Sequence, residues 1–390
     1  MTHAVMPTYQ RLPVEFVKGQ GVWLWDDAGH QYLDALMGIA VCGLGHAHPQ
    51  IAEAICEQAK TLLHTSNLYH IDPQNRLAEK LTQLSGMDSV FFSNSGAEAN
   101  EAALKIARAY GHQRGIQTPT VIVTEKSFHG RTLATLSATG NRKVQAGFEP
   151  LMPGFIRVPY NDIEAIEAVA SQTTDVVAIL VEPVQGESGV RIPAPDYLNR
   201  LRDICDRQAW LLMLDEIQTG IGRTGKMFAF QHNNITPDVM TLAKALGNGV
   251  PIGACVVNGL ASGVLGPGNH GSTFGGNFLA TRTALTVLDI IAEAHLVERA
   301  EALGQRLQQQ LAHALQHLEW VDHVRHKGLM IGIQLTQKCP GLVLHALKHQ
   351  LLINSPGEDI IRLLPALTLT DKEADTLVDR LGETLSSYSI

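Results

Sequence analysis

One lysine and one aspartate stand where a buried reactive pair would be expected. Asp215 ends the apolar run 210–214, and Lys244 lies between a second apolar run, 239–242, and the glycine-rich stretch 247–249. A strand-end carboxylate at the ligand-binding edge of an α/β sheet could keep a pyridine nitrogen protonated. A desolvated lysine has a lowered pKa and a nucleophilic amine. Each has a plainer alternative: Asp215 could cap the next turn, and Lys244 could extend into solvent.

A phosphate could bind where the apolar run 89–93 passes through Ser95, Gly96 and Ala97 into a helical pattern. The start of a helix presents free N–H groups and the positive end of the helix dipole. The plainer alternative is that Ser95 only caps the helix, with Glu98 completing a capping box.

The stretch 220–225 reads Gly-Ile-Gly-Arg-Thr-Gly and matches the GxGxxG pattern of dinucleotide-binding proteins. A nicotinamide-dependent oxidoreductase is therefore an alternative from a different class. That pattern should follow a strand at once, open a helix and precede an acidic residue about twenty positions on. Here it follows polar residues and leads into the apolar stretch 227–230. We therefore favour a glycine-rich loop near the site.

The elements that must position these residues alternate along the chain. Helical patterns separate short apolar runs that predict buried strands. These runs are 89–93, 121–123, 176–181, 210–214, 239–242 and 254–257. The alternation predicts an α/β fold with a mainly parallel sheet flanked by helices. From Gly276 the pattern changes to one long helix through Gln316, then short strands and a last helix from Asp371, which predicts a smaller α+β domain.

Three parts of the chain follow from this pattern. We expect an N-terminal segment, 1–45, that packs with the small domain. The large, cofactor-binding domain is expected over 46–275, and the small C-terminal domain over 276–390.

Composition restricts the partners. The 390 residues carry a net charge of −8 without a long basic run, which argues against nucleic acid or an anionic membrane surface as partner. The five cysteines are scattered and never spaced as CxxC, and His46 and His48 have no further ligand nearby, so no disulfide framework and no metal site is expected. Without a signal-peptide pattern or a spanning segment, the chain is expected to be a cytoplasmic enzyme that acts on small molecules.

Taken together, the motifs resemble the class III (ornithine-type) aminotransferases of the fold-type I pyridoxal-phosphate family, most closely the acetylornithine aminotransferases. The resemblance covers nearly the whole chain. It is carried by Leu-Asp-Glu-Ile-Gln-Thr-Gly at 214–220, Arg-Thr-Gly at 223–225 and the later Lys244. It implies pyridoxal 5'-phosphate as the cofactor.

The resemblance also assigns cofactor contacts. Lys244 would carry the cofactor as a Schiff base, Asp215 would pair with its ring nitrogen and Gln218 would contact its hydroxyl. Phe128 would stack on the ring. The stretch 271–277 resembles the segment by which one subunit reaches the phosphate of its neighbour, which implies a homodimer with shared active sites. The residues expected to touch the cofactor are Ser95, Gly96, Ala97, Phe128, Asp215, Gln218, Lys244, Ser272 and Thr273.

Substrate recognition is expected to rest on arginines, whose planar fork suits carboxylates. By resemblance, Arg131 binds the carboxylate far from the reacting amine, and Arg362 binds the α-carboxylate of glutamate or 2-oxoglutarate. Glu187 would cover Arg362 when the substrate offers an ω-amine, although a purely structural ion pair is the alternative. Tyr9 aligns with a substrate-contacting tyrosine of ornithine aminotransferases. Ile39 stands where those enzymes usually have a tyrosine, which argues against free ornithine.

The expected reaction is transfer of the terminal amine of N-acetylornithine to 2-oxoglutarate. The products would be N-acetylglutamate semialdehyde and glutamate, in a ping-pong sequence of arginine biosynthesis with Lys244 moving the proton. Succinylornithine, succinyl-diaminopimelate, 4-aminobutyrate and ornithine remain alternative amine donors. A non-catalytic relative is a further alternative, and the intact set of Lys244, Asp215 and Arg131 argues against it.

Overall fold

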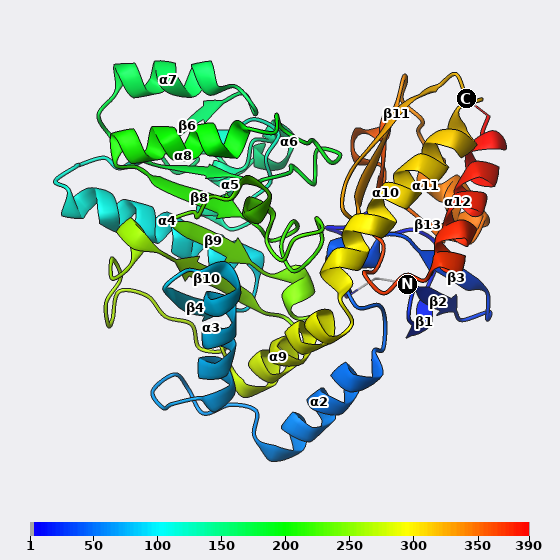
Figure 1. The fold of residues 1–390 in the computed structure, drawn as a ribbon, viewed down its shortest axis with the longest axis horizontal. Coiled ribbons are helices and arrows are strands. Elements are labelled where there is room, and N and C mark those ends of the chain that lie inside the picture. The colour runs from blue at the N-terminus through cyan, green and yellow to red at the C-terminus, as the bar shows by residue number, and fades with distance from the viewer. Residues whose placement is uncertain (1–3, 390) are drawn as a thin grey trace.

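A computed structural model describes residues 4–389 and places a seven-stranded sheet between layers of helices (Figure 1). From one edge to the other the strands are β4 (Ser89–Ser93), β10 (Gly253–Val257), β9 (Val239–Leu242), β8 (Leu211–Asp215), β7 (Val176–Val181), β5 (Thr120–Thr124) and β6 (Phe155–Val158). Strands β9, β8, β7, β5 and β6 run parallel, whereas β10 is antiparallel to both of its neighbours. The predicted mainly parallel sheet is therefore confirmed.

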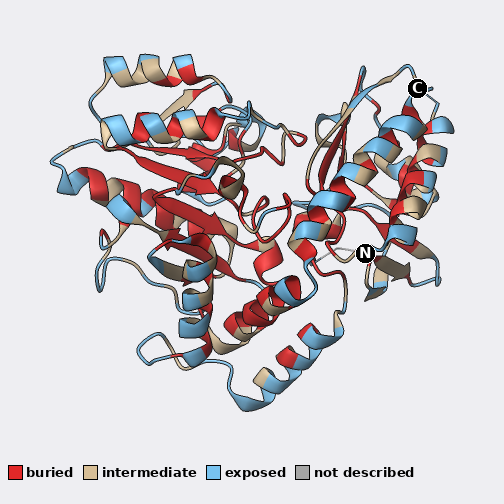
Figure 2. Cartoon of the chain, in the orientation of Figure 1, coloured by how far each residue is buried: buried red, intermediate tan, exposed pale blue. Residues whose placement is uncertain are grey.

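Both faces of this sheet are covered, because its strands are apolar on both sides. In β8, Leu211 and Met213 pack into one hydrophobic cluster, and Leu212 and Leu214 pack into the other, as the two-residue period of a strand requires. The helices around the sheet are α2 (Pro49–Thr61), α3 (Asp72–Ser85), α4 (Gly96–Gln113), α5 (Leu133–Ala138), α6 (Arg142–Gln145), α7 (Ile163–Gln172) and α8 (Tyr197–Gln208). Helices α4 and α5 cover the first face, and α7 and α8 cover the second. Figure 2 shows the central strands of this sheet buried and most of the helices around it buried on one side and exposed on the other.

The expected single helix from Gly276 through Gln316 is wrong. The structure has two helices, α9 (Phe278–Glu293) and α10 (Leu296–Leu315), joined at Ala294 and His295. His295 has φ +51°, a left-handed backbone that cannot continue a right-handed helix. The break sends α9 against α2 and α3, while α10 packs on the C-terminal elements.

Two smaller sheets complete the fold. One consists of antiparallel strands in the order β11-β12-β14, and in the other the N-terminal strands β1-β2-β3 are joined by β13, which runs parallel to β3. The elements here are β1 (Phe16–Gln20), β2 (Trp23–Asp26), β3 (Gln31–Asp34), α1 (Met37–Ala40), β11 (Val321–Lys327), β12 (Met330–Leu335), α11 (Leu342–Lys348), β13 (Leu351–Leu352), β14 (Ile360–Leu363) and α12 (Asp371–Ser386). Within residues 4–389, short 3₁₀ helices are Ala229–Asn233, Lys244–Leu246, Gly259–Ala261 and Pro356–Glu358. The smaller α+β part is confirmed, and the domain boundaries stay a prediction.

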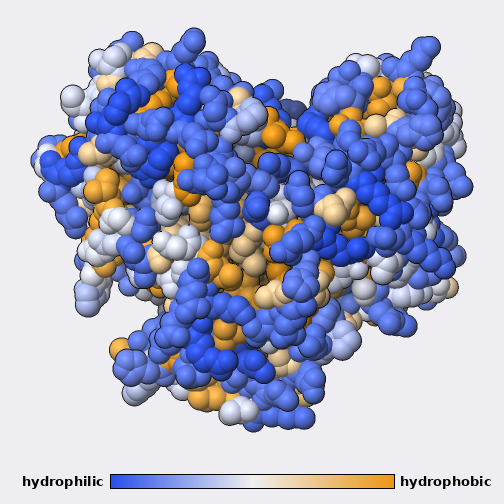
Figure 3. Space-filling model, viewed as in Figure 1, coloured by the Kyte–Doolittle hydropathy of each residue, from blue (hydrophilic) through white to orange (hydrophobic). Residues whose placement is uncertain are grey.

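The surface seen in Figure 3 is mostly hydrophilic, with apolar groups gathered toward the middle of the view. Across residues 4–389, no helix combines the length and the apolar character needed to cross a membrane.

Candidate active site

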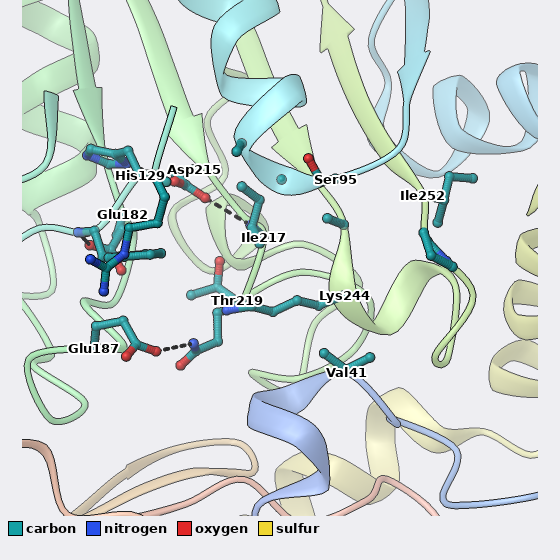
Figure 4. A pocket seen from close by; sticks show the side chains of 18 of the residues that line it. Val41, Ser95, His129, Glu182, Glu187, Asp215, Ile217, Thr219, Lys244 and Ile252 are labelled. Atoms are coloured by element: carbon teal, nitrogen blue, oxygen red, sulfur yellow. Dashed lines mark hydrogen bonds and ion pairs between the residues drawn. The ribbon is translucent and has the colours of Figure 1, made fainter. Parts of the chain in front are cut away.

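A cavity of about 380 Å³ opens where strands β8 and β9 end and helix α4 begins (Figure 4). This is the carboxyl edge of the parallel strands, where α/β sheets bind ligands. Chain segments far apart in sequence converge on it. Among the residues that line the cavity are Ser95, Gly96, Ala97, Phe128, His129, Arg131, Glu182, Glu187, Asp215, Gln218 and Lys244.

Lys244 is the second residue after β9, and its side chain reaches into this cavity between Asp215 and Glu187 (Figure 4). Its backbone has φ +45°, a left-handed conformation that is strained for a residue with a side chain. Such strain persists where the surrounding structure enforces it, often at functional sites. The Lys244 side chain lines the cavity and is partly buried, so it does not extend into solvent as the plainer alternative expected.

Burial lowers the pKa of Lys244, and the positive charge of Arg362 acts in the same direction. The carboxylates of Glu187, Asp215 and Glu182 oppose this effect without reversing it. A lysine with a lowered pKa holds more of its amine in the neutral, nucleophilic form.

Asp215 is buried at the end of β8 and accepts hydrogen bonds from three directions. Its Oδ2 accepts from Asn100 Nδ2 at 2.8 Å and lies 2.7 Å from His129 Nδ1. Its Oδ1 accepts from the N–H of Ile217 at 3.1 Å, so the turn-capping alternative is also correct. Donors on both oxygens stabilise a carboxylate and fix its orientation.

Asn100 and His129 are site residues that the sequence interpretation missed. The Asn100 amide donates to Asp215 and to the His129 carbonyl at 2.8 Å, and its own oxygen accepts from Thr241 Oγ1 at 2.8 Å. This fully buried side chain therefore connects helix α4 to strand β9, to the His129 backbone and to the Asp215 carboxylate. The sequence could have identified Asn100 as a site residue, because it lies one helical turn after Gly96 and so faces the same side of α4.

The first turn of helix α4 is capped by Ser95 and packs closely against Ile217, which follows strand β8. Ser95 caps the helix by accepting from the N–H of Glu98 at 3.2 Å. The capping box of the plainer alternative does not form, because the Glu98 carboxylate accepts from the N–H of Asn94 at 2.6 Å and from its side-chain amide at 2.8 Å instead of from the N–H of Ser95. A Cβ on Gly96 would lie 2.7 Å from Ile217 Cδ1, so any larger residue would force the Ile217 side chain to shift.

Phe128 and Arg131 lie together on another wall of the cavity. The Arg131 guanidinium sits 5.6 Å from the centre of the Phe128 ring, and the residue is exposed. The backbone N–H of Phe128 donates to the buried Glu182 carboxylate at 3.0 Å. Burial raises the pKa of Glu182 to about 7, against the lowering effect of nearby His129.

Glu187 and Arg362 form an ion pair at 2.7 Å beside the cavity. Arg362 is 1% exposed and Glu187 is 35% exposed, so the carboxylate is the accessible partner. Burial would raise the pKa of Glu187, but the charge of Arg362 and its hydrogen bond outweigh burial and lower it. Gln218 Nε2 lies 3.5 Å from the same carboxylate, and Asn354 Oδ1 accepts from Arg362 Nη2 at 2.8 Å.

Five of the expected residues are not among those that line this cavity. Arg362 lies beside it, paired with Glu187. Ser272 and Thr273 line a neighbouring hollow with Asn94, whose amide donates to Ser272 Oγ at 3.2 Å. Tyr9 is 76% exposed on the N-terminal segment. Ile39 packs against a separate, small hydrophobic cluster. Its backbone is left-handed, with φ +66°.

The GxGxxG stretch lies in turns and opens no helix. Its Arg223 is 1% exposed and donates to the carbonyls of Leu329 and Pro365. This stretch therefore connects the large sheet to the C-terminal elements.

The model of the family Aminotransferase class-III matches residues 4–385. The chain belongs to the class III aminotransferases. The acetylornithine aminotransferase of Nitrosomonas europaea is 58% identical over 388 residues, 100% of this chain and 98% of that protein. Acetylornithine aminotransferase 1 of Bordetella bronchiseptica is 50% identical and covers 97% of this aminotransferase and 96% of its own length.

Solved structures agree with this assignment. Ornithine aminotransferase from Toxoplasma gondii superposes with a TM-score of 0.95 at 34% identity, over 98% of this aminotransferase and 93% of that chain. Acetylornithine aminotransferase from Elizabethkingia anophelis gives a TM-score of 0.88 at 36% identity, over 98% and 96% of the two chains. The expected family and the fold-type I architecture are confirmed.

Class III aminotransferases use pyridoxal 5'-phosphate, and the cavity fits that cofactor. Gln218 Oε1 and His129 Nε2 are buried on its wall without a hydrogen-bond partner in the described part of the chain. Buried polar atoms are rarely left unpaired, so these two point to a polar ligand. The N–H groups at the start of α4 suit a phosphate, Asp215 suits a protonated ring nitrogen, and Lys244 supplies the amine.

Proposed function

We propose that this aminotransferase transfers the terminal amine of N-acetylornithine to 2-oxoglutarate and forms N-acetylglutamate semialdehyde and glutamate. The observation that carries the proposal is the difference between two arginines beside Lys244. Arg131 is exposed, whereas Arg362 is covered by Glu187. Such a site accepts a substrate with one distal carboxylate while Glu187 is in place, and a dicarboxylic substrate when Glu187 moves away. The names of the relatives that are 58% and 50% identical support the same substrate.

The proposed cofactor contacts follow from the walls of the cavity. Ser95, Gly96 and Ala97 would hold the phosphate, and Phe128 would stack on the ring. Asp215 would hold the ring nitrogen, and Gln218 would contact the ring hydroxyl. When bound, pyridoxal 5'-phosphate supplies an electron sink for the carbon that loses its proton.

Lys244 has two tasks in this proposal. Its Nζ would hold the cofactor until the substrate amine takes its place, which would free the lysine amine. The freed amine then accepts the proton from the substrate carbon that carries the nitrogen, and holds it for return in the same half-reaction. The lowered pKa of Lys244 favours the neutral amine that this step needs.

We also propose that the enzyme works as a cytoplasmic homodimer. Ser272 and Thr273 lie outside the cavity of their own chain, which fits a contribution to the phosphate site of a second copy. Exposed Phe274 and Leu68 near the same loop offer apolar surface for such a contact.

Initial rates with 2-oxoglutarate and four donors test the substrate. N-acetylornithine should give the highest kcat/KM, above N-succinylornithine, ornithine and 4-aminobutyrate. An equal or higher value with 4-aminobutyrate would overturn the proposal. If N-succinylornithine were the better donor, the proposed roles of the site residues would stand, but the acyl group of the substrate would be succinyl instead of acetyl. If the purified protein bound a nicotinamide nucleotide and held no pyridoxal 5'-phosphate, the proposed cofactor would be wrong.

A further inference from the structure

The ion pair between Glu187 and Arg362 is held asymmetrically. Arg362 lies on strand β14 and pairs there with Gly332 of strand β12. Its side chain is 1% exposed. Glu187 lies on the loop after β7, and its carboxylate makes one short bond to Arg362 and one of 3.5 Å from Gln218. The arginine is therefore the fixed member of the pair.

Asn354 is the second partner of the Arg362 side chain. Its Oδ1 accepts from Arg362 Nη2 at 2.8 Å, and its carbonyl accepts from the Arg362 backbone N–H at 2.8 Å. One residue thus holds both the backbone and the guanidinium of Arg362. This partner is a neutral amide, so it orients the arginine without neutralising its charge.

The loop that carries Glu187 cannot easily move as a whole. Gln185 and Arg191 close its base with two backbone hydrogen bonds, of 3.1 and 3.0 Å. On the side of the loop that returns to Arg191, Arg325 donates to the carbonyls of Val190 at 2.8 Å and Gly189 at 2.6 Å. Release of Arg362 is therefore a rotation of the Glu187 side chain alone.

When Glu187 rotates away, Arg362 needs another group to keep its orientation. Its Nε is buried and has no partner among residues 4–389, so the guanidinium has donors to spare for an incoming carboxylate. Without Asn354, neither side of the guanidinium would be held by a polar side chain at that moment. A carboxylate would then meet an arginine that it must first order, at a cost in affinity.

We propose that Asn354 is a positioning residue that holds Arg362 in place when Glu187 releases it. Asn354 therefore governs binding of the dicarboxylic substrate and has little influence on the half-reaction with the ω-amine. This inference rests on the proposed function, in which Arg362 receives the α-carboxylate of 2-oxoglutarate.

The test uses the holoenzyme, with glutarate as a dicarboxylate that cannot react. Calorimetric titration should show that Asn354→Ala weakens glutarate binding about tenfold or more, as loss of a hydrogen bond to a charged group predicts. Stopped-flow absorbance should show a raised KM for 2-oxoglutarate and a much smaller change in the half-reaction with N-acetylornithine. Asn199→Ala is the matched control, because Asn199 is also half-buried and donates a 2.9 Å hydrogen bond far from the site, on α8.

Unchanged glutarate affinity, or equal losses in both half-reactions, would overturn the role of Asn354. If the alanine variant fails to fold, Asn354→Asp carries the test, because it keeps an oxygen for Arg362 Nη2. Its added charge should compete with the glutarate carboxylate and weaken binding, and wild-type affinity would refute the inference. A wild-type enzyme that binds glutarate but does not use N-acetylornithine would remove the proposed donor and leave the role of Asn354 standing.

Discussion

Replacement of Asn100 tests the network that holds Asp215. Asn100→Ala removes three hydrogen bonds of a fully buried side chain, to Asp215, the His129 carbonyl and Thr241. A bond to a carboxylate contributes about 1.5–3 kcal/mol and a neutral bond about 1 kcal/mol, so the sum is about 4 kcal/mol. We expect the free energy of unfolding of the cofactor-free chain to fall by about this amount.

Thr241→Val is the matched comparison, because it removes only the neutral bond to the Asn100 oxygen. Its expected loss is about 1 kcal/mol. Urea unfolding of the three proteins measures both losses, and equilibrium dialysis with pyridoxal 5'-phosphate measures the functional effect. We expect Asn100→Ala to weaken cofactor binding about tenfold, because the Asp215 carboxylate loses one of its fixed donors. Equal losses in the two variants, or unchanged cofactor affinity in Asn100→Ala, would refute this account of the network.

Three further predictions concern the walls of the cavity. Because the pKa of Glu182 is raised from 4.5 to about 7, its contribution to stability is present below pH 4.5 and lost as the pH rises through 7. The difference in unfolding free energy between wild type and Glu182→Gln should therefore shift by about 3 kcal/mol between pH 4.5 and 8, and a constant difference would contradict the assignment. Arg131→Ala should lower kcat/KM about 10-fold to 100-fold for both N-acetylornithine and 2-oxoglutarate, and an effect on one substrate alone would argue against a shared distal-carboxylate site. Gly96→Ala should weaken cofactor binding, because its Cβ would meet Ile217 at 2.7 Å, and adding Ile217→Ala should restore part of the affinity; no rescue would place the defect elsewhere.

The main sheet could be predicted from the sequence because its strands are buried on both faces and therefore read as continuous apolar runs. Asp215 and Lys244 follow two such runs, and parallel strands bring their carboxyl ends to one edge, so their meeting in one cavity was also predictable. The exception is β10, which runs antiparallel between β4 and β9. Apolar runs specify burial and leave strand direction open.

The missed features depend on contacts between distant parts of the chain. Asn100 reads as a polar residue within a helix until Asp215, 115 residues later, is placed beside it. Asn354 lies near Arg362 in sequence, but its importance depends on Glu187, which lies on the loop after strand β7 of another sheet. The left-handed turn at His295 has no glycine to signal it, so the pattern read as one helix.

A single-turnover experiment tests the central claim most directly. The holoenzyme is mixed with N-acetylornithine in the absence of 2-oxoglutarate, and N-acetylglutamate semialdehyde is measured per active site. We predict a stoichiometric burst that stops until 2-oxoglutarate is added, and no burst from Lys244→Ala. The absence of product from the wild-type enzyme, or an equally fast burst with ornithine or 4-aminobutyrate, would contradict the proposed reaction.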